Sequence, residues 1–84
     1  MYYVYVLYSK KDGKLYIGQT EDIDRRVNAH NAGKVKSTKH RRPLILVHSE
    51  KYSTRTEAIE RERELKSISA RDFKRKLRQK ASEI

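Results

Sequence analysis

The chain has 84 residues, and 21 Lys and Arg against 11 Asp and Glu give a net charge of +10. Such an excess favours a polyanion, above all nucleic acid, as the partner. Since only 36% of the residues are hydrophobic, we expect one domain with a small core and no large buried substrate cavity. The absence of cysteine excludes disulfides and thiolate zinc sites. No apolar run approaches the ~20 residues that span a bilayer, so we expect a soluble, unexported protein without a membrane partner.

The first apolar run is typical of a β-strand. Tyr2–Tyr8 contains only β-branched residues, aromatic residues and leucine, and alternation places Tyr5 and Leu7 on the same face. The Asp12-Gly13 pair favours a tight turn, because both residue types tolerate the backbone angles of a hairpin. The sequence therefore predicts an antiparallel hairpin with a second strand over Leu15–Gln19.

A helix is predicted next, with Thr20 as its N-terminal cap and the acidic residues of Glu21–Asp24 in its first turn. Gly33 is suited to end it. The following segment, Lys34–Arg42, is basic and has no hydrophobic periodicity, which indicates an exposed loop.

Leu44–Val47 is continuously aliphatic, which is typical of a central strand buried on both faces, and we expect it to be the third strand. Thr54 begins a capping box, which predicts a helix from there to about Ser67. A third helix is expected to begin at Ser69 and to fray beyond Lys80.

Glu62 lies near the middle of the apolar stripe of the predicted second helix, between Ala58, Ile59 and Leu65. A carboxylate that points inward must be paired, protonated or bound to a cation. One interpretation is an internal salt bridge with a basic side chain. The other is a ligand for a divalent cation, since Mg²⁺ is often held by one or two carboxylates together with water and substrate phosphate.

Arg26 and His30 lie one turn apart at the edge of the apolar face of the first helix, whereas Arg25 is expected to be merely exposed. Arginine is suited to binding phosphate, and histidine to transferring a proton at neutral pH. The alternative is an ordinary amphipathic helix with Arg26 stacked over the sheet.

Two of the six tyrosines, Tyr5 and Tyr16, are predicted to face the same side of neighbouring strands, together with Gly18. Glycine inside a strand often marks a place where another group approaches the backbone closely. A phenol is a poor base at neutral pH unless nearby cations lower its pKa, and we expect Arg26 and a metal ion to do so.

These residues occur in an order that resembles the GIY-YIG endonucleases, in particular their small single-domain bacterial branch. Tyr3-Val4-Tyr5 stands at the first motif, and Tyr16-Ile17-Gly18 matches the second. Arg26, His30 and Glu62 follow at the corresponding spacings. The resemblance covers essentially the whole chain, residues 1–84.

The resemblance implies an α+β fold in which helices flank a three-stranded antiparallel sheet, in the order β-β-α-β-α-α. It further implies a metal-dependent endonuclease that uses one Mg²⁺ or Mn²⁺ ion. Carried over by position, Tyr5, Tyr16, Arg26 and His30 become catalytic residues, and Glu62 becomes both catalytic and the metal ligand. On this interpretation Tyr5 is the base and relays its proton toward His30, Tyr16 positions water or phosphate, Arg26 stabilises phosphoryl oxygens, and the cation on Glu62 supports the leaving oxygen.

Two positions depart from the family pattern. Tyr3 replaces the glycine that opens the first motif, and no asparagine follows Asn31, although many relatives have a functional one after the metal-binding glutamate. We expect Lys66 or Arg71 to make the missing contact.

Contact with nucleic acid is predicted to depend on backbone charge, which carries no sequence information. The residues expected to make it lie in the basic loop and near the third helix: Lys34, Lys36, Lys39, His40, Arg41, Arg42, Lys66, Arg71, Lys74 and Arg75. We therefore expect a monomer, cytoplasmic and associated with the nucleoid, that cuts single-stranded, branched or damaged DNA in repair, recombination or processing.

Two other functions fit the same sequence. One is a nucleic-acid-binding module of the same fold without cleavage activity, and the other is a nuclease subunit that needs a protein partner. The complete set of predicted catalytic residues favours the enzyme, because a module that only binds phosphate gains nothing from the carboxylate of Glu62.

Overall fold

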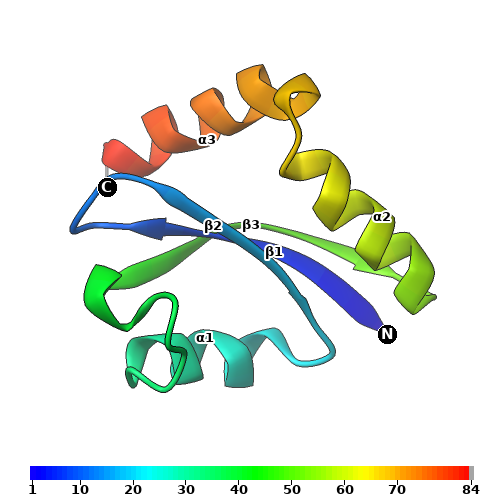
Figure 1. Cartoon of the computed structure of the whole chain (residues 1–84), viewed down its shortest axis with the longest axis horizontal. Coiled ribbons are helices and arrows are strands. Elements are labelled where there is room, and N and C mark those ends of the chain that lie inside the picture. The colour runs from blue at the N-terminus through cyan, green and yellow to red at the C-terminus, as the bar shows by residue number, and fades with distance from the viewer. Residues whose placement is uncertain (84) are drawn as a thin grey trace.

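The computed structural model describes residues 1–83 and has the predicted α+β architecture, with helices on both faces of a three-stranded antiparallel sheet (Figure 1). The elements in chain order are β1 (Tyr2–Ser9), β2 (Leu15–Thr20), α1 (Ile23–Asn31), a 3₁₀ helix (Lys39–Arg41), β3 (Leu44–Tyr52), α2 (Arg55–Leu65), a 3₁₀ helix (Ile68–Ala70) and α3 (Arg71–Ser82). The predicted order of elements is confirmed. None of the helices within residues 1–83 combines the length and the apolar character needed to cross a membrane.

The central strand of the sheet is β1, because the strand order is β2-β1-β3. The prediction that Leu44–Val47 forms a central strand is therefore wrong: β3 is an edge strand, and the side chain of Leu46 is 43% exposed. An aliphatic run alone does not distinguish a central strand from an edge strand that packs under helices. The pairing of β1 with β3 also shifts register between Val6 and Leu7, which is a β-bulge.

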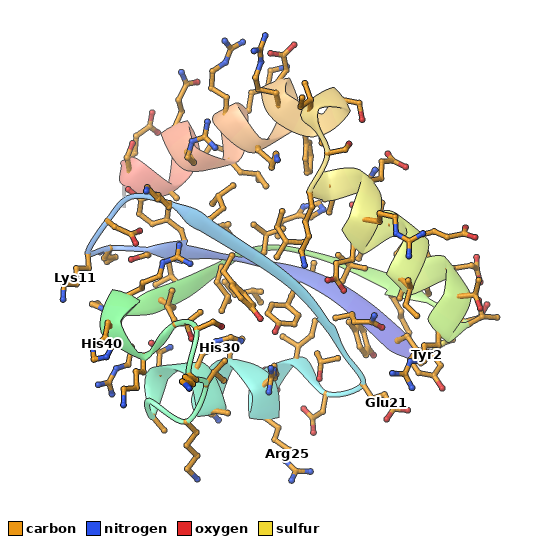
Figure 2. The ribbon with its side chains drawn as sticks, viewed as in Figure 1. Tyr2, Lys11, Glu21, Arg25, His30 and His40 are labelled. Carbon is orange, nitrogen blue, oxygen red and sulfur yellow. The ribbon has the colours of Figure 1, made fainter. Side chains whose placement is uncertain are left out.

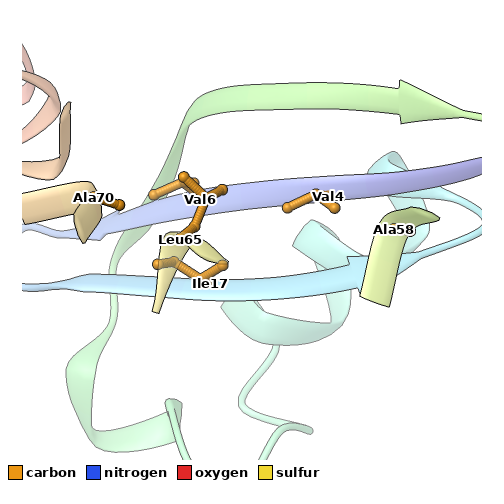
Figure 3. Packing of buried hydrophobic residues seen from close by; sticks show 6 residues of the cluster. All are labelled: Val4, Val6, Ile17, Ala58, Leu65 and Ala70. Atoms are coloured by element: carbon orange, nitrogen blue, oxygen red, sulfur yellow. The ribbon is translucent and has the colours of Figure 1, made fainter. Parts of the chain in front are cut away.

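The two faces of the sheet pack against different helices. On one face, Val4, Val6 and Ile17 pack against α2 and the 3₁₀ helix before α3, as Figure 3 shows, and Phe73 and Leu77 of α3 add to this cluster. On the other face, Tyr5, Leu7 and Leu44 are buried together with Tyr16 and with Val27 of α1. The alternation of side chains between the two faces of β1 thus determines which of its residues face α1 (Figure 1).

The helix starts differ from the sequence-based expectation at two of three places. The cap of α1 is Asp22, which accepts a hydrogen bond from Arg25 N, whereas Thr20 forms a turn with the backbone of Asp22. Thr54 caps α2 as predicted. The expected cap at Ser69 is wrong, because the preceding 3₁₀ helix places Ala70 at the start of α3.

The C-terminal end of α3 is also more ordered than predicted. The helix continues past Lys80 to Ser82, and Ala81 is buried. A small apolar side chain at that position allows the last turn to pack, so the helix ends later than predicted.

The basic segment between α1 and β3 is only partly an exposed loop. Gly33, at φ +77°, follows the end of α1 as predicted. Thr38 is fully buried, and the Arg41 guanidinium forms an ion pair of 2.8 Å with Asp12 in the hairpin turn. The hydrogen bond from the backbone N–H of Lys14, followed by this contact, lowers the pKa of Asp12 to about 2. The segment is therefore fastened to the hairpin rather than free.

Candidate active site

The two motif tyrosines lie together on the face of the sheet that α1 covers. Tyr5 is opposite Gly18 in the β1–β2 register, and the ring centroids of Tyr5 and Tyr16 are 6.3 Å apart. A Cβ atom at position 18 would lie 2.6 Å from the Tyr5 hydroxyl oxygen. The group that approaches Gly18 closely is thus the phenol of Tyr5, which needs a position without a side chain.

A buried chain of hydrogen bonds holds the Tyr5 hydroxyl. His30 of α1 is fully buried, its Nε2 is 3.0 Å from the Tyr5 hydroxyl, and its Nδ1 is 2.7 Å from the Thr38 hydroxyl. Thr38 donates to the carbonyl oxygen of Val35, so it is free to accept from Nδ1–H. This arrangement assigns Nε2 as the acceptor of the Tyr5 proton.

His30 is held in the neutral form by its surroundings. Burial is the main reason that its pKa lies below 6.5, and the nearby positive charge of Arg26 lowers it further. A neutral imidazole has one N–H donor and one nitrogen acceptor. The donor binds the Thr38 hydroxyl, and the acceptor binds the Tyr5 hydroxyl. The predicted pairing of Arg26 and His30 at one edge of α1 is therefore present, with His30 inside and Arg26 half-exposed.

Arg26 faces both tyrosines. Its Nε donates to the Tyr5 hydroxyl at 3.3 Å, and this hydrogen bond is the main reason that its pKa is raised, with Tyr16 contributing as well. The neighbouring Arg25 points away from the sheet, as predicted (Figure 2).

Arg26 alone does not bring the pKa of Tyr5 below its usual value. Burial raises the pKa of Tyr5 above 10.0, and the charges of Tyr16 and Glu62 add to the rise, whereas Arg26 opposes it. The cost of ionising a phenol away from water thus exceeds the stabilisation by the guanidinium.

Glu62 belongs to α2, on the opposite face, and its carboxylate still acts on Tyr5 through its charge. Its side chain is 20% exposed, and Lys66 Nζ donates to its Oε2 at 2.7 Å. A salt bridge is therefore present, but it lies at the surface and is not the internal one that the sequence left open as one interpretation. Of the two residues expected to replace the absent asparagine, Lys66 is the one that pairs with Glu62, and its predicted site contact stays a prediction.

Glu62 offers a hard cation a single carboxylate. Residues 1–83 contain no group of three or more His, Cys, Asp or Glu side chains that would enclose a metal ion by themselves. A site with one carboxylate is open to water and phosphate oxygens, which is how Mg²⁺ is commonly bound beside a nucleic-acid substrate. Glu62 is thus suited to hold such an ion once Lys66 gives way.

Some of the predicted nucleic-acid contacts converge on a groove of about 530 Å³ between the start of β2 and the two C-terminal helices. Tyr16 lies at this groove together with four basic side chains: Lys14, Lys66, Lys74 and Arg78. We call it the β2 groove. Arg71 and Arg75 do not line it, and Arg75 forms an ion pair with Asp72 on the exposed side of α3.

The cations of the basic loop are divided differently. Lys39, His40 and Arg42 line a second hollow, of about 570 Å³, together with Lys11 of the hairpin turn, which lies beside His40 in Figure 2. Arg42 also donates hydrogen bonds to the backbone oxygens of Lys39 and Asn31. Arg41 is occupied by Asp12, Lys34 lines a hollow that contains three carboxylates beside α1, and Lys36 is exposed.

Sequence reasoning missed a polar cluster beside the predicted site. Glu50 of β3 accepts hydrogen bonds from His48, Tyr52 and both Nε and one terminal nitrogen of Arg61. Arg61 also lies over the ring of Phe73, so the cluster ties α2 to β3 and α3. The alternation of His48, Glu50 and Tyr52 along one strand face was the available signal. Thr38 was likewise absent from the predicted site residues, and the fold brings it to His30. Lys14 was also absent, although it lies only two residues before Tyr16.

Comparison with known proteins agrees with this geometry. The family model described as the GIY-YIG catalytic domain matches residues 1–77. The chain is 46% identical over 69 residues to a UPF0213 protein of Staphylococcus haemolyticus, covering 81% of this chain and 83% of that protein. It is 43% identical over 84 residues to a UPF0213 protein of Haloquadratum walsbyi, covering 99% and 92%. The solution NMR structure of a UPF0213 protein from Bacillus halodurans aligns with a TM-score of 0.53 at 39% identity, covering 87% of this chain and 81% of that one.

Proposed function

Since the chain belongs to the GIY-YIG family of nucleases, we propose that it is a DNA endonuclease that hydrolyses phosphodiester bonds with one divalent cation, Mg²⁺ or Mn²⁺. One observation carries the proposal: Tyr5, Tyr16, Arg26 and His30 form a single contiguous polar cluster. A module that only binds phosphate needs the cations alone.

Arg26 binds the scissile phosphate in this proposal. Its guanidinium is half-exposed, keeps its charge at every physiological pH and is held by Tyr5 through Nε, which leaves the terminal nitrogens for phosphate oxygens. Charge that develops on these oxygens during hydrolysis is stabilised in place, without reorganisation of the site.

We assign the contact with the attacking water to Tyr16 rather than to Tyr5. Tyr5 is 1% exposed and its hydroxyl already has two protein partners, whereas Tyr16 is partly exposed beside the β2 groove. A residue that orients or deprotonates water must reach that water directly. The sequence-based role of Tyr5 as base is thereby replaced by a positioning role.

Tyr5 and His30 act together as the support of Arg26. The proton of Tyr5 points to His30 Nε2, so the hydroxyl oxygen is left to accept from Arg26. Because His30 has no exposed surface, it passes no proton to solvent and instead fixes the orientation of the phenol. Glu62 would hold the cation, which, when bound, supplies positive charge to the phosphoryl and leaving oxygens.

The substrates we propose are single-stranded, branched or damaged DNA, and the protein would act in repair, recombination or DNA processing, in the cytoplasm at the nucleoid. Two basic hollows on a domain with principal extents of 32 × 29 × 20 Å support contacts with backbone phosphates. Such contacts give affinity without sequence preference.

The test is cleavage of labelled single-stranded, duplex and branched DNA with Mg²⁺ or Mn²⁺, alongside EDTA and the variants Glu62→Gln, Tyr16→Phe and Arg26→Ala. We expect Glu62→Gln and EDTA to abolish cleavage while DNA binding persists, and Tyr16→Phe to lower kcat by at least about 100-fold. Arg75→Ala is the matched control, since it removes a cation on the exposed side of α3. Binding without cleavage on every substrate would instead indicate a binding module or a missing partner.

A further inference from the structure

Lys66 belongs both to an ion pair with Glu62 and to the lining of the β2 groove. It forms the 2.7 Å ion pair with Glu62, and it lines the β2 groove with Lys14, Lys74 and Arg78. Its side chain is 54% exposed, against 20% for that of Glu62. The ammonium group thus belongs to the more exposed partner, and the carboxylate to the more buried one.

The charges of the groove favour a second partner for Lys66. No carboxylate side chain lines the groove within residues 1–83, whereas four cations do, and like charges in one groove repel one another. A polynucleotide strand lying there brings a phosphate every few ångströms, each a strong acceptor for an ammonium group. Lys66 then exchanges one negative partner, Glu62, for another, a strand phosphate.

Resting on the proposed function, we propose that Lys66 occupies the Glu62 carboxylate in the free protein and releases it when a nucleic-acid strand fills the β2 groove, so that strand binding prepares the cation site. The lysine ammonium and a divalent cation compete for the same carboxylate oxygens. Coupling between two ligands is reciprocal, so a cation bound at Glu62 also frees Lys66 for the strand.

This exchange keeps the free protein a poor binder of metal and reserves the complete site for the substrate complex. Lys66 lies one helical turn from Glu62 on α2, and its backbone N–H donates to the Glu62 carbonyl oxygen at the helix end. Its Cα therefore stays fixed while the side chain changes partner. The exchange needs rotamer changes only, which occur in nanoseconds for exposed side chains.

The first test measures Mn²⁺ binding to the free protein by electron paramagnetic resonance of the unbound ion. We expect Lys66→Met to bind Mn²⁺ about tenfold more tightly than the wild type, because both the competing ion pair and a nearby positive charge are lost. Lys66→Arg, which preserves the ion pair, should resemble the wild type. Lys74→Met is the matched control, because it removes the same charge from the groove but leaves the Glu62 ion pair intact. The double variant Lys66→Met/Glu62→Gln should lose the increase in Mn²⁺ affinity.

The second test measures anisotropy of labelled oligo-dT and oligo-U with and without Ca²⁺ at constant ionic strength. Ca²⁺ should strengthen binding by the wild type relative to Lys66→Met, and the two oligonucleotides distinguish a DNA strand from an RNA strand. Equal Mn²⁺ affinity of Lys66→Met and Lys74→Met, or an equal effect of Ca²⁺ on the wild type and Lys66→Met, would overturn the proposal. Neither result involves cleavage, so the proposed function is judged separately by the nuclease assay with Glu62→Gln.

Discussion

The substitution Gly18→Ala tests the central geometric feature of the site. A methyl group at this position would lie 2.6 Å from the Tyr5 hydroxyl oxygen and 2.8 Å from its Cζ. Ordinary contacts begin near 3.4 Å, so the phenol has to move by about 0.8 Å. The movement disturbs the hydrogen bond between this hydroxyl and His30 Nε2, which are now 3.0 Å apart.

Two effects add to the loss of stability. Crowding of a well-packed interior costs about 1–3 kcal/mol, and a buried imidazole nitrogen that loses its partner costs about 1–3 kcal/mol more. Allowing for partial relaxation, we expect the free energy of unfolding to fall by about 2–4 kcal/mol. For a domain of this size such a loss lowers Tm by roughly 10–25 °C.

The assay is urea and thermal unfolding, followed by circular dichroism, of the wild type, Gly18→Ala, Tyr5→Leu and the double variant. Leucine lacks the atoms that meet the new methyl group, so Gly18→Ala should cost less than about 1 kcal/mol in that background. The difference between the two backgrounds measures the contact itself. An equal cost of Gly18→Ala in both backgrounds, or no cost in the wild type, would refute the reasoning.

Three further predictions concern charge. Although burial raises the pKa of Glu50, hydrogen bonds from Arg61, Tyr52 and His48 outweigh it and lower the pKa to about 2. A carboxylate with a depressed pKa stabilises the fold above its unfolded pKa, so the free energy of unfolding should decline from about pH 4.5 to about pH 2, and less steeply in Glu50→Gln. Because the pKa of His30 is lowered, its imidazole should take up a proton at a lower pH than an exposed histidine in ¹⁵N NMR spectra, and the free energy of unfolding should decline as the pH falls below 6.5, where the unfolded chain binds the proton first. Finally, Lys74→Ala in the β2 groove should reduce the slope of log affinity for DNA against log salt by about 1, whereas the exposed Lys76→Ala should change it little.

The sequence predicted the elements of the fold more reliably than their places in the sheet. Alternation in Tyr2–Ser9 and the turn around Gly13 are local properties, and both are confirmed. Which strand is central depends on pairing between distant segments, and an aliphatic run such as Leu44–Val47 does not record it. The N-terminal cap of a helix was ambiguous where two candidate residues lie close together in the sequence, as Thr20 and Asp22 do before α1.

The site was predictable as a set of residues but not as a set of roles. Spacing along α1 and on neighbouring strands placed Arg26, His30 and the two tyrosines on one side of the sheet. Exposure decides which of them reaches water, and exposure depends on how α1 and the segment around Thr38 close over Tyr5. No pattern in the chain itself distinguishes the buried tyrosine from the accessible one.

The burial of Tyr5 and His30 explains how Arg26 can be held in place without losing its charge. A guanidinium that is to bind phosphate must not turn toward a neighbouring carboxylate, and a neutral hydrogen-bond acceptor fixes Arg26 without neutralising it. Burial supplies that neutrality, because it raises the pKa of the phenol and lowers that of the imidazole. Under the proposed function the two halves of the site differ: Arg26 is held by a neutral partner and would stay ready for phosphate, whereas Glu62 is held by a charged one, Lys66, and would have to be released.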